Sequence, residues 1–522
     1  MTASPPVEQP RRSSLSGRTI LHGALITTSA VVLGNVLGLI RDLLIAGVFG
    51  ADGRTDAFLV AWTLPEAAVP LLIDGAMTLL MIPIFTRALQ RRAPRTVDGA
   101  VEGTDPVREA VGGTLPQLFL ALVALSGIFA LGAPWLVRLL APGLVDPALG
   151  VNAMRIISVS VLFIGIAGYF VAALRAHLVY GPPAFVTVAM NVGIIGVILL
   201  GHTWWGVLAA VIGASVGSAL MVAVQLPAFI RRVGLVWRPI RGGGLALTAF
   251  MPIAAYILLR QSQVFVERFV GSELSPGTIS HLNYAQKIGQ VPSTLALILA
   301  VVTFPQLAKH INAGNPDQAH RRTAIDIHII GAIVLAATVY LYAFAEPVVQ
   351  VLFQRGAFTA LDSQATGAIL RVYVLGLLGQ VLVDVLCRSL FSERATWVPA
   401  ISMGIGLLVT GVIAEAGAGT WGAPVIAAAN AVGITVTGAL LVRRRRSAVV
   451  PAAALWLIIG RMLPGTVLTT LFALWLAERL APLPAVWSVV LGLPSVVVVF
   501  AVAGVLTRGV PMPRLARRGA HR

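Results

Sequence analysis

Long apolar runs follow one another along almost the whole chain, and they restrict its fold more than any other feature. A membrane-spanning helix needs about 20 predominantly apolar residues. Only 11% of the residues are charged and 57% are apolar, whereas a water-soluble domain has roughly 25% charged residues. We therefore predict an all-α polytopic membrane protein with about 14 transmembrane helices. The runs lie near residues 20–40, 57–86, 115–140, 153–174, 184–201, 203–230, 244–266, 279–307, 323–350, 364–387, 397–416, 421–442, 453–477 and 484–507.

The basic residues alternate between the connections and thereby predict the orientation. If the N-terminus lies inside, most of the 38 Lys and Arg residues fall in every second connection, including residues 87–108 and the run Arg443 to Arg446. Loops that stay in the cytoplasm carry such an excess of positive charge. The pattern predicts an even number of spans with both termini in the cytoplasm. Residues 1–17, rich in Pro, Ser and Arg, are expected to be a disordered tail.

The sequence gives little support to cofactor or metal chemistry. The single cysteine, Cys387, cannot form an internal disulfide, and the eight histidines lack ligand spacing, so no metal site is predicted. Neither lysine, Lys287 or Lys309, follows a Gly-x-x-x-x-Gly run, so no ATP-binding loop is expected. The chain has a net charge of +17, but its basic residues lie between apolar spans and do not share a face with stacking aromatics. We therefore predict no nucleic-acid partner.

A few basic residues lie inside or at the edge of apolar spans. At such depth an ionisable group needs a partner or a wet cavity. Arg260, Glu267 and Arg268 stand at spacings of seven and eight and are expected to share one helix face. Asp384 and Arg388, four residues apart, are expected to form a buried pair. The basic residues of this set are Arg260, Arg268, Lys287 and Arg461.

A second group of charges flanks the connection between the first two runs. Arg41 and Asp42 end the first run, and Asp56 begins the second. We predict that they line a cavity with Arg260, Arg268, Lys287 and Glu267. The carboxylates have two readings, either as structural partners that neutralise the cations or as gating groups that a substrate displaces.

A weak internal repeat connects the two groups of charges. Four pairs stand at an offset of 227, namely Arg41/Arg268, Gly50/Gly277, Asp56/Asn283 and Pro65/Pro292. Duplicated halves are frequent in transporters, and the substrate site then lies between them. Five prolines within spans, Pro65, Pro70, Pro83, Pro252 and Pro292, are expected to act as gating hinges or as static kinks.

Several sequence stretches resemble one known family. The most specific is EPVVQVLFQRGAFTALDSQATGAILRVYVLGL at residues 346–377, and VLGLIRDLLIAGVFGADGRTDAFLVAWTLP at 36–65 is the second. LLAPGL at 139–144, QLP at 225–227 and NYAQKIGQVP at 283–292 follow the same order. Across roughly residues 20–445 the chain resembles the bacterial MviN/MurJ lipid II flippases of the MOP exporter superfamily.

The resemblance implies two six-helix lobes in a V shape, residues 18–235 and 236–446. Residues 447–508 would be spans 13 and 14, which form a groove for a lipid tail, and residues 509–522 a basic cytoplasmic tail. It implies a transporter rather than an enzyme, located in the bacterial cytoplasmic membrane. The family carries undecaprenyl-pyrophosphate-linked muropeptide from the inner to the outer leaflet by alternating access.

Residue by residue, the resemblance places Arg41 at a required cavity arginine, Asp56 at a functional aspartate and Lys287 at an arginine position. Arg260 has no counterpart in the family pattern. The chain departs from that pattern at Asn35, Val69 and Pro70, where the family has arginines. The substrate is therefore lipid II or another polyprenyl-pyrophosphate-linked glycan.

A pyrophosphate is anionic, and guanidinium groups pair with its oxygens in a bidentate way. We therefore expect Arg41, Arg260, Arg268 and Lys287 to bind substrate. Asp42, Asp56 and Glu267 are expected to serve gating or ion coupling, and Arg41 is expected to act together with Asp56. No cofactor is expected; coupling to the membrane potential or to a monovalent cation stays open.

Other functions stay open as well. A membrane glycosyltransferase would need carboxylates in a large outer loop, and the outer loops are short. A multidrug or metabolite exporter would favour an acidic cavity, whereas the four cavity cations outnumber Asp42, Asp56 and Glu267. A transport-inactive cell-wall scaffold would tolerate loss of cavity charge. The expected partners are the glycan lipid, membrane lipids and cell-wall synthesis proteins, and the chain is expected to be a monomer.

Overall fold

The computed structural model describes residues 17–91, 105–237, 247–294, 316–393, 397–444 and 452–507. All regular structure in these ranges is helical. We call residues 17–237 the first half; its helices are α1 (Gly17–Phe49), α2 (Gly53–Ala68), the π-helix η1 (Val69–Met77), α3 (Thr78–Gln90), α4 (Pro106–Leu131), α5 (Ala133–Leu140), α6 (Pro147–Ala176), α7 (Gly181–Ala184), α8 (Val186–Trp205) and α9 (Leu208–Arg232).

We call residues 247–444 the second half. It begins with α10 (Leu247–Ser272) and a helix over residues 278–294, which we call helix 278–294. The remaining helices are α12 (Pro316–Ala343), α13 (Ala345–Phe353), α14 (Ala360–Tyr373), the short η2 (Val374–Gly376), α15 (Leu377–Glu393), α16 (Val398–Trp421) and α17 (Ala423–Arg444). Two helices follow the second half, α18 (Ala452–Leu480) and α19 (Ala485–Leu506).

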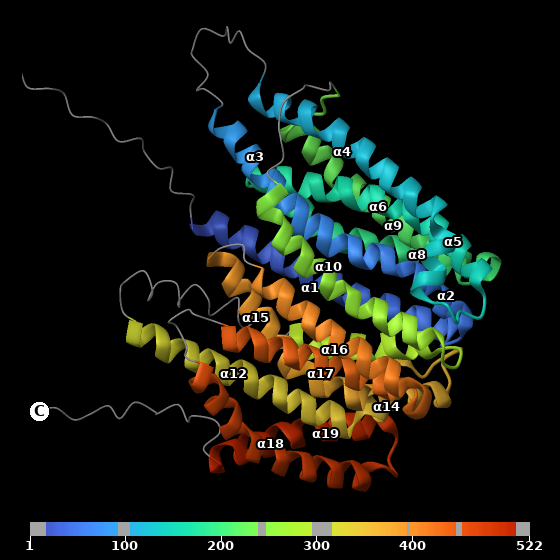
Figure 1. Ribbon diagram of the computed structural model, residues 1–522, viewed down its shortest axis with the longest axis vertical. Helices are drawn as coiled ribbons and strands as arrows, with labels where there is room; N and C mark the ends of the chain where they lie inside the picture. Colours follow the sequence, from blue (N-terminus) through green and yellow to red (C-terminus); the bar gives the residue numbers. More distant parts are fainter. Residues whose placement is uncertain are drawn as a thin grey trace, which may run out of the picture.

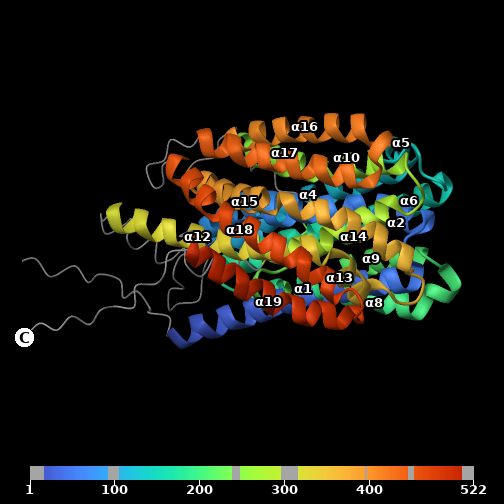
Figure 2. The ribbon, with the colours of Figure 1, turned by 90° about the horizontal axis from the view of Figure 1, so that it is seen from below.

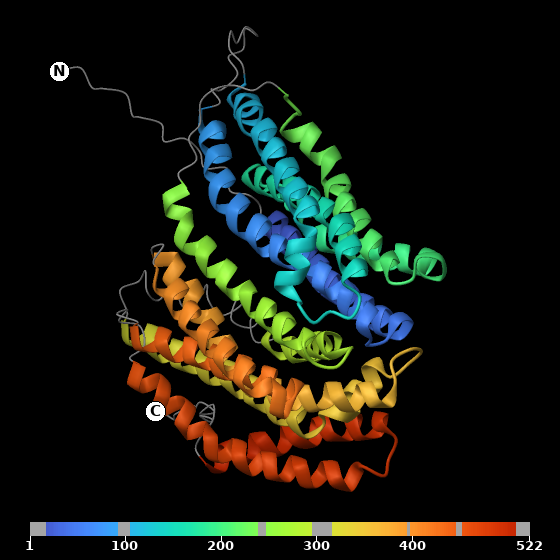
Figure 3. The ribbon, with the colours of Figure 1, turned by 45° about the vertical axis from the view of Figure 1, so that its right-hand side comes forward.

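The helices lie side by side, and their axes are roughly aligned with one another (Figure 2). The first half occupies one end of the long axis, the second half follows, and α18 and α19 lie at the other end (Figure 1). Helix α10 lies between the first half and the orange α16 and α17 (Figure 3), and it contacts α2 and η1 on one side and α16 and α17 on the other. It is therefore one of the helices that join the halves.

The described residues contain 11 helices long and apolar enough to cross a membrane, or 12 if the bent pair His328–Ala343 and Ala345–Phe353 is one span. That pair bends by 82°. Helix α10, which carries three charged side chains, and helix 278–294 lie outside this count. The all-α polytopic fold is confirmed, and the total of about 14 spans stays a prediction. The same holds for the lobe boundaries, and the tails at 1–16 and 509–522 lie outside the described residues.

Each half has its own apolar core. In the first half, buried residues of α2, α6, α8 and α9 pack together, with Ile157 and Ile194 fully buried. In the second half, Phe344 and Phe353 lie in a core that also includes Ala473 of α18 and Val496 of α19. Lipid is as apolar as these side chains, so packing rather than water exclusion holds the helices together.

Close glycine contacts occur at matching places in the two halves. A methyl group added at Gly193 of α8 would lie 2.5 Å from Cα of Gly217 in α9. One added at Gly406 of α16 would lie 2.5 Å from the carbonyl oxygen of Gly433 in α17. Small residues allow membrane helices to approach this closely. The last two helices of each half therefore pack in the same manner.

The turn before the second helix of each half also repeats. Gly50 has φ +74 and Gly277 has φ +88, both in the left-handed region that favours glycine. They are one of the pairs in the predicted repeat, and each precedes a helix, α2 or helix 278–294. This pair of the repeat thus has a common structural cause.

The second apolar run is one continuous helical segment with a change of type in its middle. A π-helix, η1, begins at Val69 and has Pro70 in its first turn, while Pro65 and Pro83 lie inside α2 and α3. Proline lacks a backbone N–H and crowds the preceding turn, so the ladder shifts there. The expected bend is thus taken up by a helix of wider turns, and its role as a hinge stays a prediction.

Candidate functional site

Two of the four predicted binding cations meet between the halves on one carboxylate. Lys287 Nζ donates to Glu66 Oε1 at 3.1 Å, and Arg268 Nη2 donates to Glu66 Oε2 at 2.6 Å. Arg268 Nη1 also donates to Thr63 Oγ1. We call these four residues the Glu66 cluster. Thr63 and Glu66 stand one turn apart on α2, so they face the same neighbour, whereas both cations belong to the second half.

The Glu66 cluster is largely withdrawn from solvent. The Arg268 side chain is 3% exposed, that of Glu66 16% and that of Lys287 22%. Two cations share one carboxylate, so the cluster carries an excess of positive charge. Such ionic hydrogen bonds are strong, and they connect the first half to the second.

The sequence reasoning missed Glu66. A signal was present, because Glu66 is an ionisable residue within an apolar run and such residues mark functional positions in membranes. Its presence corrects the predicted charge balance. With Glu66, and with Asp384 paired to Arg260, the carboxylates number five against four cations. The preference for an anion therefore rests on the local excess at the Glu66 cluster.

Helix α10 carries two polar stripes where the spacing predicted one. Arg268 points to the first half, and Gln261 Nε2 donates to the carbonyl oxygen of Glu66 at 2.8 Å. Arg260 and Glu267 face the second half. Glu267 accepts from Asn430 Nδ2 of α17. Arg260 and Glu267 thus share a face as predicted, whereas the prediction is wrong for Arg268, because adjacent helical positions differ by about 100°.

A small pocket lies between α10 and helix 278–294. Its polar lining consists of Glu267, Arg268, Asn283 and Gln286, and its apolar lining of Val264, Ile279 and Leu282. Glu267 and Arg268 thus face a common polar space although they bind opposite halves. Among the described residues, no group of three or more His, Cys, Asp or Glu side chains is arranged as a metal site.

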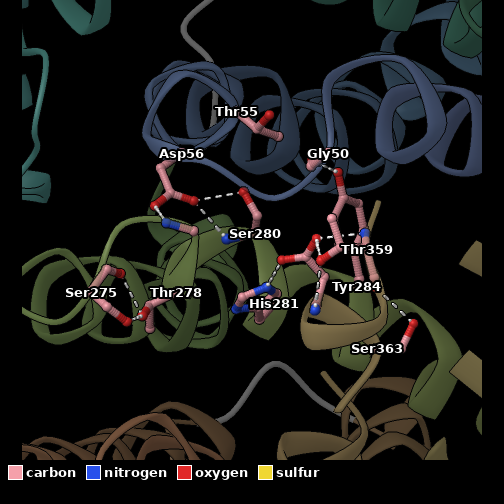
Figure 4. Close-up of polar contacts among 12 residues, drawn as sticks. Gly50, Thr55, Asp56, Ser275, Thr278, Ser280, His281, Tyr284, Thr359 and Ser363 are labelled. Carbon is pink, nitrogen blue, oxygen red and sulfur yellow. Dashed lines mark hydrogen bonds and ion pairs between the residues drawn. The ribbon is translucent and has the colours of Figure 1, made fainter. Parts of the chain in front are cut away.

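Asp56 forms a second connection between the halves, at the start of α2 (Figure 4). Its Oδ2 accepts from the backbone N–H of Gly277 at 2.7 Å. Its Oδ1 accepts from the N–H and the hydroxyl of Ser280, at 2.8 and 2.6 Å. We call these three residues the Asp56 contact. Asp56 therefore caps the N-terminus of helix 278–294 from the other half, as a carboxylate favours.

Backbone contacts surround the Asp56 contact. The hydroxyl of Tyr284 donates to the carbonyl oxygen of Gly50 at 3.2 Å (Figure 4). The N–H of Ala357 donates to the carbonyl oxygen of Gly47 at 2.8 Å. Beside them, His281 Nε2 lies 3.0 Å from Asp362 Oδ1, within the second half. At this end of α2 the halves thus touch backbone to backbone.

Arg41 lies apart from both connections. Its Nε and Nη2 donate to Asp42 Oδ1 at 2.9 and 2.8 Å, and its Nη1 donates to Asn191 Oδ1 at 3.0 Å. Its guanidinium lies 4.9 Å from the ring centroid of Trp62, a cation–π distance. All of these partners belong to the first half. The expected joint action of Arg41 and Asp56 has no direct contact to support it.

Arg260 pairs within the second half. Its Nη1 lies 2.7 Å from Asp384 Oδ1 of α15 and donates to the hydroxyl of Tyr256 at 3.0 Å. Asp384 was expected to pair with Arg388, whose side chain lies outside the described residues. Of the predicted binding cations, the structure therefore brings together Arg268 and Lys287, and places Arg41 and Arg260 elsewhere.

Apolar helices in two similar halves, with buried charges meeting between them, define a multi-pass membrane transport protein. A family model described as lipid II flippase MurJ matches residues 45–497. The chain therefore belongs to the lipid II flippase MurJ family, and the resemblance of its sequence motifs is confirmed.

Individual relatives agree with this assignment. The lipid II flippase MurJ of Burkholderia cenocepacia is 28% identical over 409 residues, 74% of this chain and 76% of that protein. A probable lipid II flippase of Bdellovibrio bacteriovorus is 26% identical over 447 residues, 81% and 82% of the two chains. Because these alignments cover about three quarters or more of the chain, the similarity includes both halves.

Solved structures agree on the fold. A structure titled lipid II flippase MurJ, inward closed conformation, superimposes with a TM-score of 0.75 at 20% identity, covering 93% of this chain and 99% of that one. An inward-facing multidrug resistance MATE transporter of the MOP superfamily gives 0.63 at 12% identity, covering 80% and 95%. The chain thus shares its fold with both of these transporters.

Proposed function

We propose that this chain moves lipid II, a polyprenyl-pyrophosphate-linked muropeptide, from the inner to the outer leaflet of the bacterial cytoplasmic membrane by alternating access. The family assignment and the names of its relatives support this substrate. The observation that carries the proposal is the Glu66 cluster, in which one carboxylate occupies two cations between the halves, the buried Arg268 and the partly buried Lys287. An anionic pyrophosphate has the chemistry to replace that carboxylate.

By accepting from Arg268 and Lys287, Glu66 acts as a stand-in for the substrate anion. The pyrophosphate carries more negative charge and more acceptor oxygens than one carboxylate, and the Arg268 guanidinium offers a fork that fits two of them. When the substrate takes Arg268 and Lys287, Glu66 loses both partners. The first half then loses its ionic connection to the second half.

The Asp56 contact remains after that exchange. It consists of hydrogen bonds from neutral donors, each worth about 1.5–3 kcal/mol when the acceptor is charged. We propose that the halves separate at this contact to release substrate on the other side, while α10 keeps its contacts with α16 and α17. Asp42 accepts from Arg41 on the same helix, α1. A gating role of Asp42 therefore acts through a movement of α1.

The energy source is part of the proposal. At an inside-negative potential, each negative charge moved outward gains about 2.3 kcal/mol per 100 mV. A monovalent cation would add to this, and of the expected coupling carboxylates Glu267 is the better placed because it lines the polar pocket, whereas Asp56 is occupied by three donors. No other cofactor is proposed.

The arrangement around the site is proposed with it. The lobes span residues 18–235 and 236–446, and α18 and α19 form the groove for the lipid tail. Both termini face the cytoplasm, with the ends of α1 and α2 at Gly50 on the outer side. The protein works as a monomer and delivers its product to cell-wall synthesis proteins.

Reconstitution tests the function directly. Proteoliposomes that contain the purified chain and lipid II in one leaflet should expose it in the other leaflet faster than protein-free vesicles do. A phospholipid without pyrophosphate should move at the protein-free rate. If lipid II moves no faster than in protein-free vesicles while a cationic drug is exported, the chain is an exporter of the MATE type.

A further inference from the structure

Arg260 belongs to a polar stripe on α10 that the Glu66 cluster does not use. Tyr256, Arg260, Gln263 and Glu267 follow at spacings of four, three and four, so they share one face of the helix. The stripe meets Asp384 of α15 at one end and Asn430 of α17 at the other. Arg260 lies about 12 Å from Arg268 along the helix axis, because eight residues rise 1.5 Å each.

The stripe has more donors than acceptors in the described part of the chain. Both contacts of Arg260 are made by Nη1, and neither Nη2 nor Nε has a partner there. Gln263, one turn further on, is 8% exposed, and its Nε2 is buried without a hydrogen-bond partner among the described residues. An unpaired buried donor is costly, so a ligand oxygen that accepts from it is favoured.

The Arg260–Asp384 pair is open to a ligand. Each side chain keeps 26% of its surface exposed, far more than the 3% of Arg268. The neighbouring residue Gln261 donates to the first half, so Arg260 stands beside the junction of the halves where substrate would lie. The pair is therefore placed for exchange rather than for closed packing.

We propose that Arg260, with Gln263, binds a carboxylate of the peptide that the lipid-linked substrate carries, in exchange for Asp384. This inference rests on the proposed function and deepens it. A carboxylate is favoured because Arg260 already pairs with the carboxylate of Asp384, so the exchange replaces one single charge by another. A pyrophosphate is disfavoured at this place because Asp384 leaves the pair neutral, while the Glu66 cluster keeps an excess of positive charge. The spacing of about 12 Å suits the two ends of one extended head group.

The test compares three lipids in binding and translocation assays with the purified full chain. The first has a peptide with free carboxylates, the second the same peptide with its carboxylates amidated, and the third the pyrophosphate-linked disaccharide without a peptide. Arg260→Gln should lower the preference for the first lipid over the second by about tenfold, as loss of a charged hydrogen bond predicts. Arg260→Lys should recover part of it, because lysine keeps the charge without the fork.

Two further variants separate binding from a structural role. Asp384→Asn removes the competing carboxylate, so it should raise the affinity for the first lipid relative to the second. Arg232→Gln, at an exposed arginine that ends α9 and lies outside the site and the groove, is the matched control and should leave the preference unchanged. Thermal unfolding of each variant reports whether it is folded.

The outcomes are distinct. If the wild type binds and moves the lipids but Arg260→Gln lowers all three equally, Arg260 is structural or reads the pyrophosphate, and the inference is wrong. The inference is also wrong if folded Asp384→Asn binds the first lipid more weakly than the wild type does. If the wild type moves none of the three lipids, the proposed function fails and the inference fails with it.

Discussion

The two connections between the halves, the Asp56 contact and the Glu66 cluster, start from the same helix and differ in chemistry. They lie about 15 Å apart along α2, since ten residues rise 1.5 Å each. Within the described ranges Asp56 accepts from neutral groups, two backbone N–H groups and a hydroxyl, and glycine backbones lie around it. Glu66 accepts from two cationic side chains.

This difference separates closing the protein from sensing its substrate. The Asp56 contact is formed by neutral donors and closely packed backbone, so its strength depends on how well the surfaces fit. An anionic ligand would bind these groups only weakly. The cations of the Glu66 cluster are attracted to any stronger anion that reaches them. Helix α2 thus carries both the Asp56 contact, which depends on a close fit, and the Glu66 cluster, which a substrate can displace.

The largest effect is expected at Lys287. Lys287→Ala removes one of the two cations, so pyrophosphate oxygens lose a buried partner at a cost of about 2–5 kcal/mol in substrate binding. Lys287→Arg keeps the charge and should retain transport. The measurement is lipid II translocation at matched protein levels in proteoliposomes. Wild-type rates for the alanine variant would mean that Lys287 is only a structural partner of Glu66.

A smaller effect is expected at the Asp56 contact, and on stability rather than on binding. Gly277→Ala places a methyl group 2.3 Å from the carbonyl oxygen of Ala51 and forces alanine into left-handed backbone, with strain of about 1–3 kcal/mol. Thermal unfolding in detergent should show the loss. Gly411→Ala is the control, because nothing lies within 4 Å of its added methyl group. Equal melting temperatures for Gly277→Ala and Gly411→Ala would show that the Asp56 contact does not depend on close packing at Gly277.

The smallest effect concerns Arg41 and Asp56. The two residues share no partner among the described residues, so the effects of Arg41→Ala and Asp56→Asn on stability should add to within about 0.5 kcal/mol. A double-mutant cycle by thermal or chemical unfolding measures this. A coupling above 1 kcal/mol, or rescue by the swap Arg41→Asp with Asp56→Arg, would show that the two residues work as one pair across the first two helices.

The sequence predicted the parts of the site that depend on local pattern. The helical spans and the match of Gly50 with Gly277 in a repeat could be read from the sequence. Apolar runs, residue type and family motifs also singled out Asp56, Arg268 and Lys287, which lie at contacts between the halves. Each of these depends on a short segment or on composition. The motifs also carried the family assignment, because they extend over most of the chain.

The partners of the buried charges could not be read in this way. Arg268 turned out to face Glu66, while its neighbour Glu267 faces Asn430, because one residue along a helix changes the direction by about 100°. Which direction meets which helix is decided by packing between distant segments. For the same reason Asp384 was matched with a residue on its own helix, whereas its described partner is Arg260 of α10.

The central claim is that Glu66 holds the place of the substrate anion, and the affinity for a polyprenyl-pyrophosphate lipid tests it most directly. The dissociation constant should be measured for the wild type, Glu66→Gln and Asp56→Asn, each shown to be folded. Glu66→Gln removes the competing charge, so it should bind about tenfold more tightly, while Asp56→Asn should stay within about twofold of the wild type. Weaker or unchanged binding by folded Glu66→Gln would contradict the account.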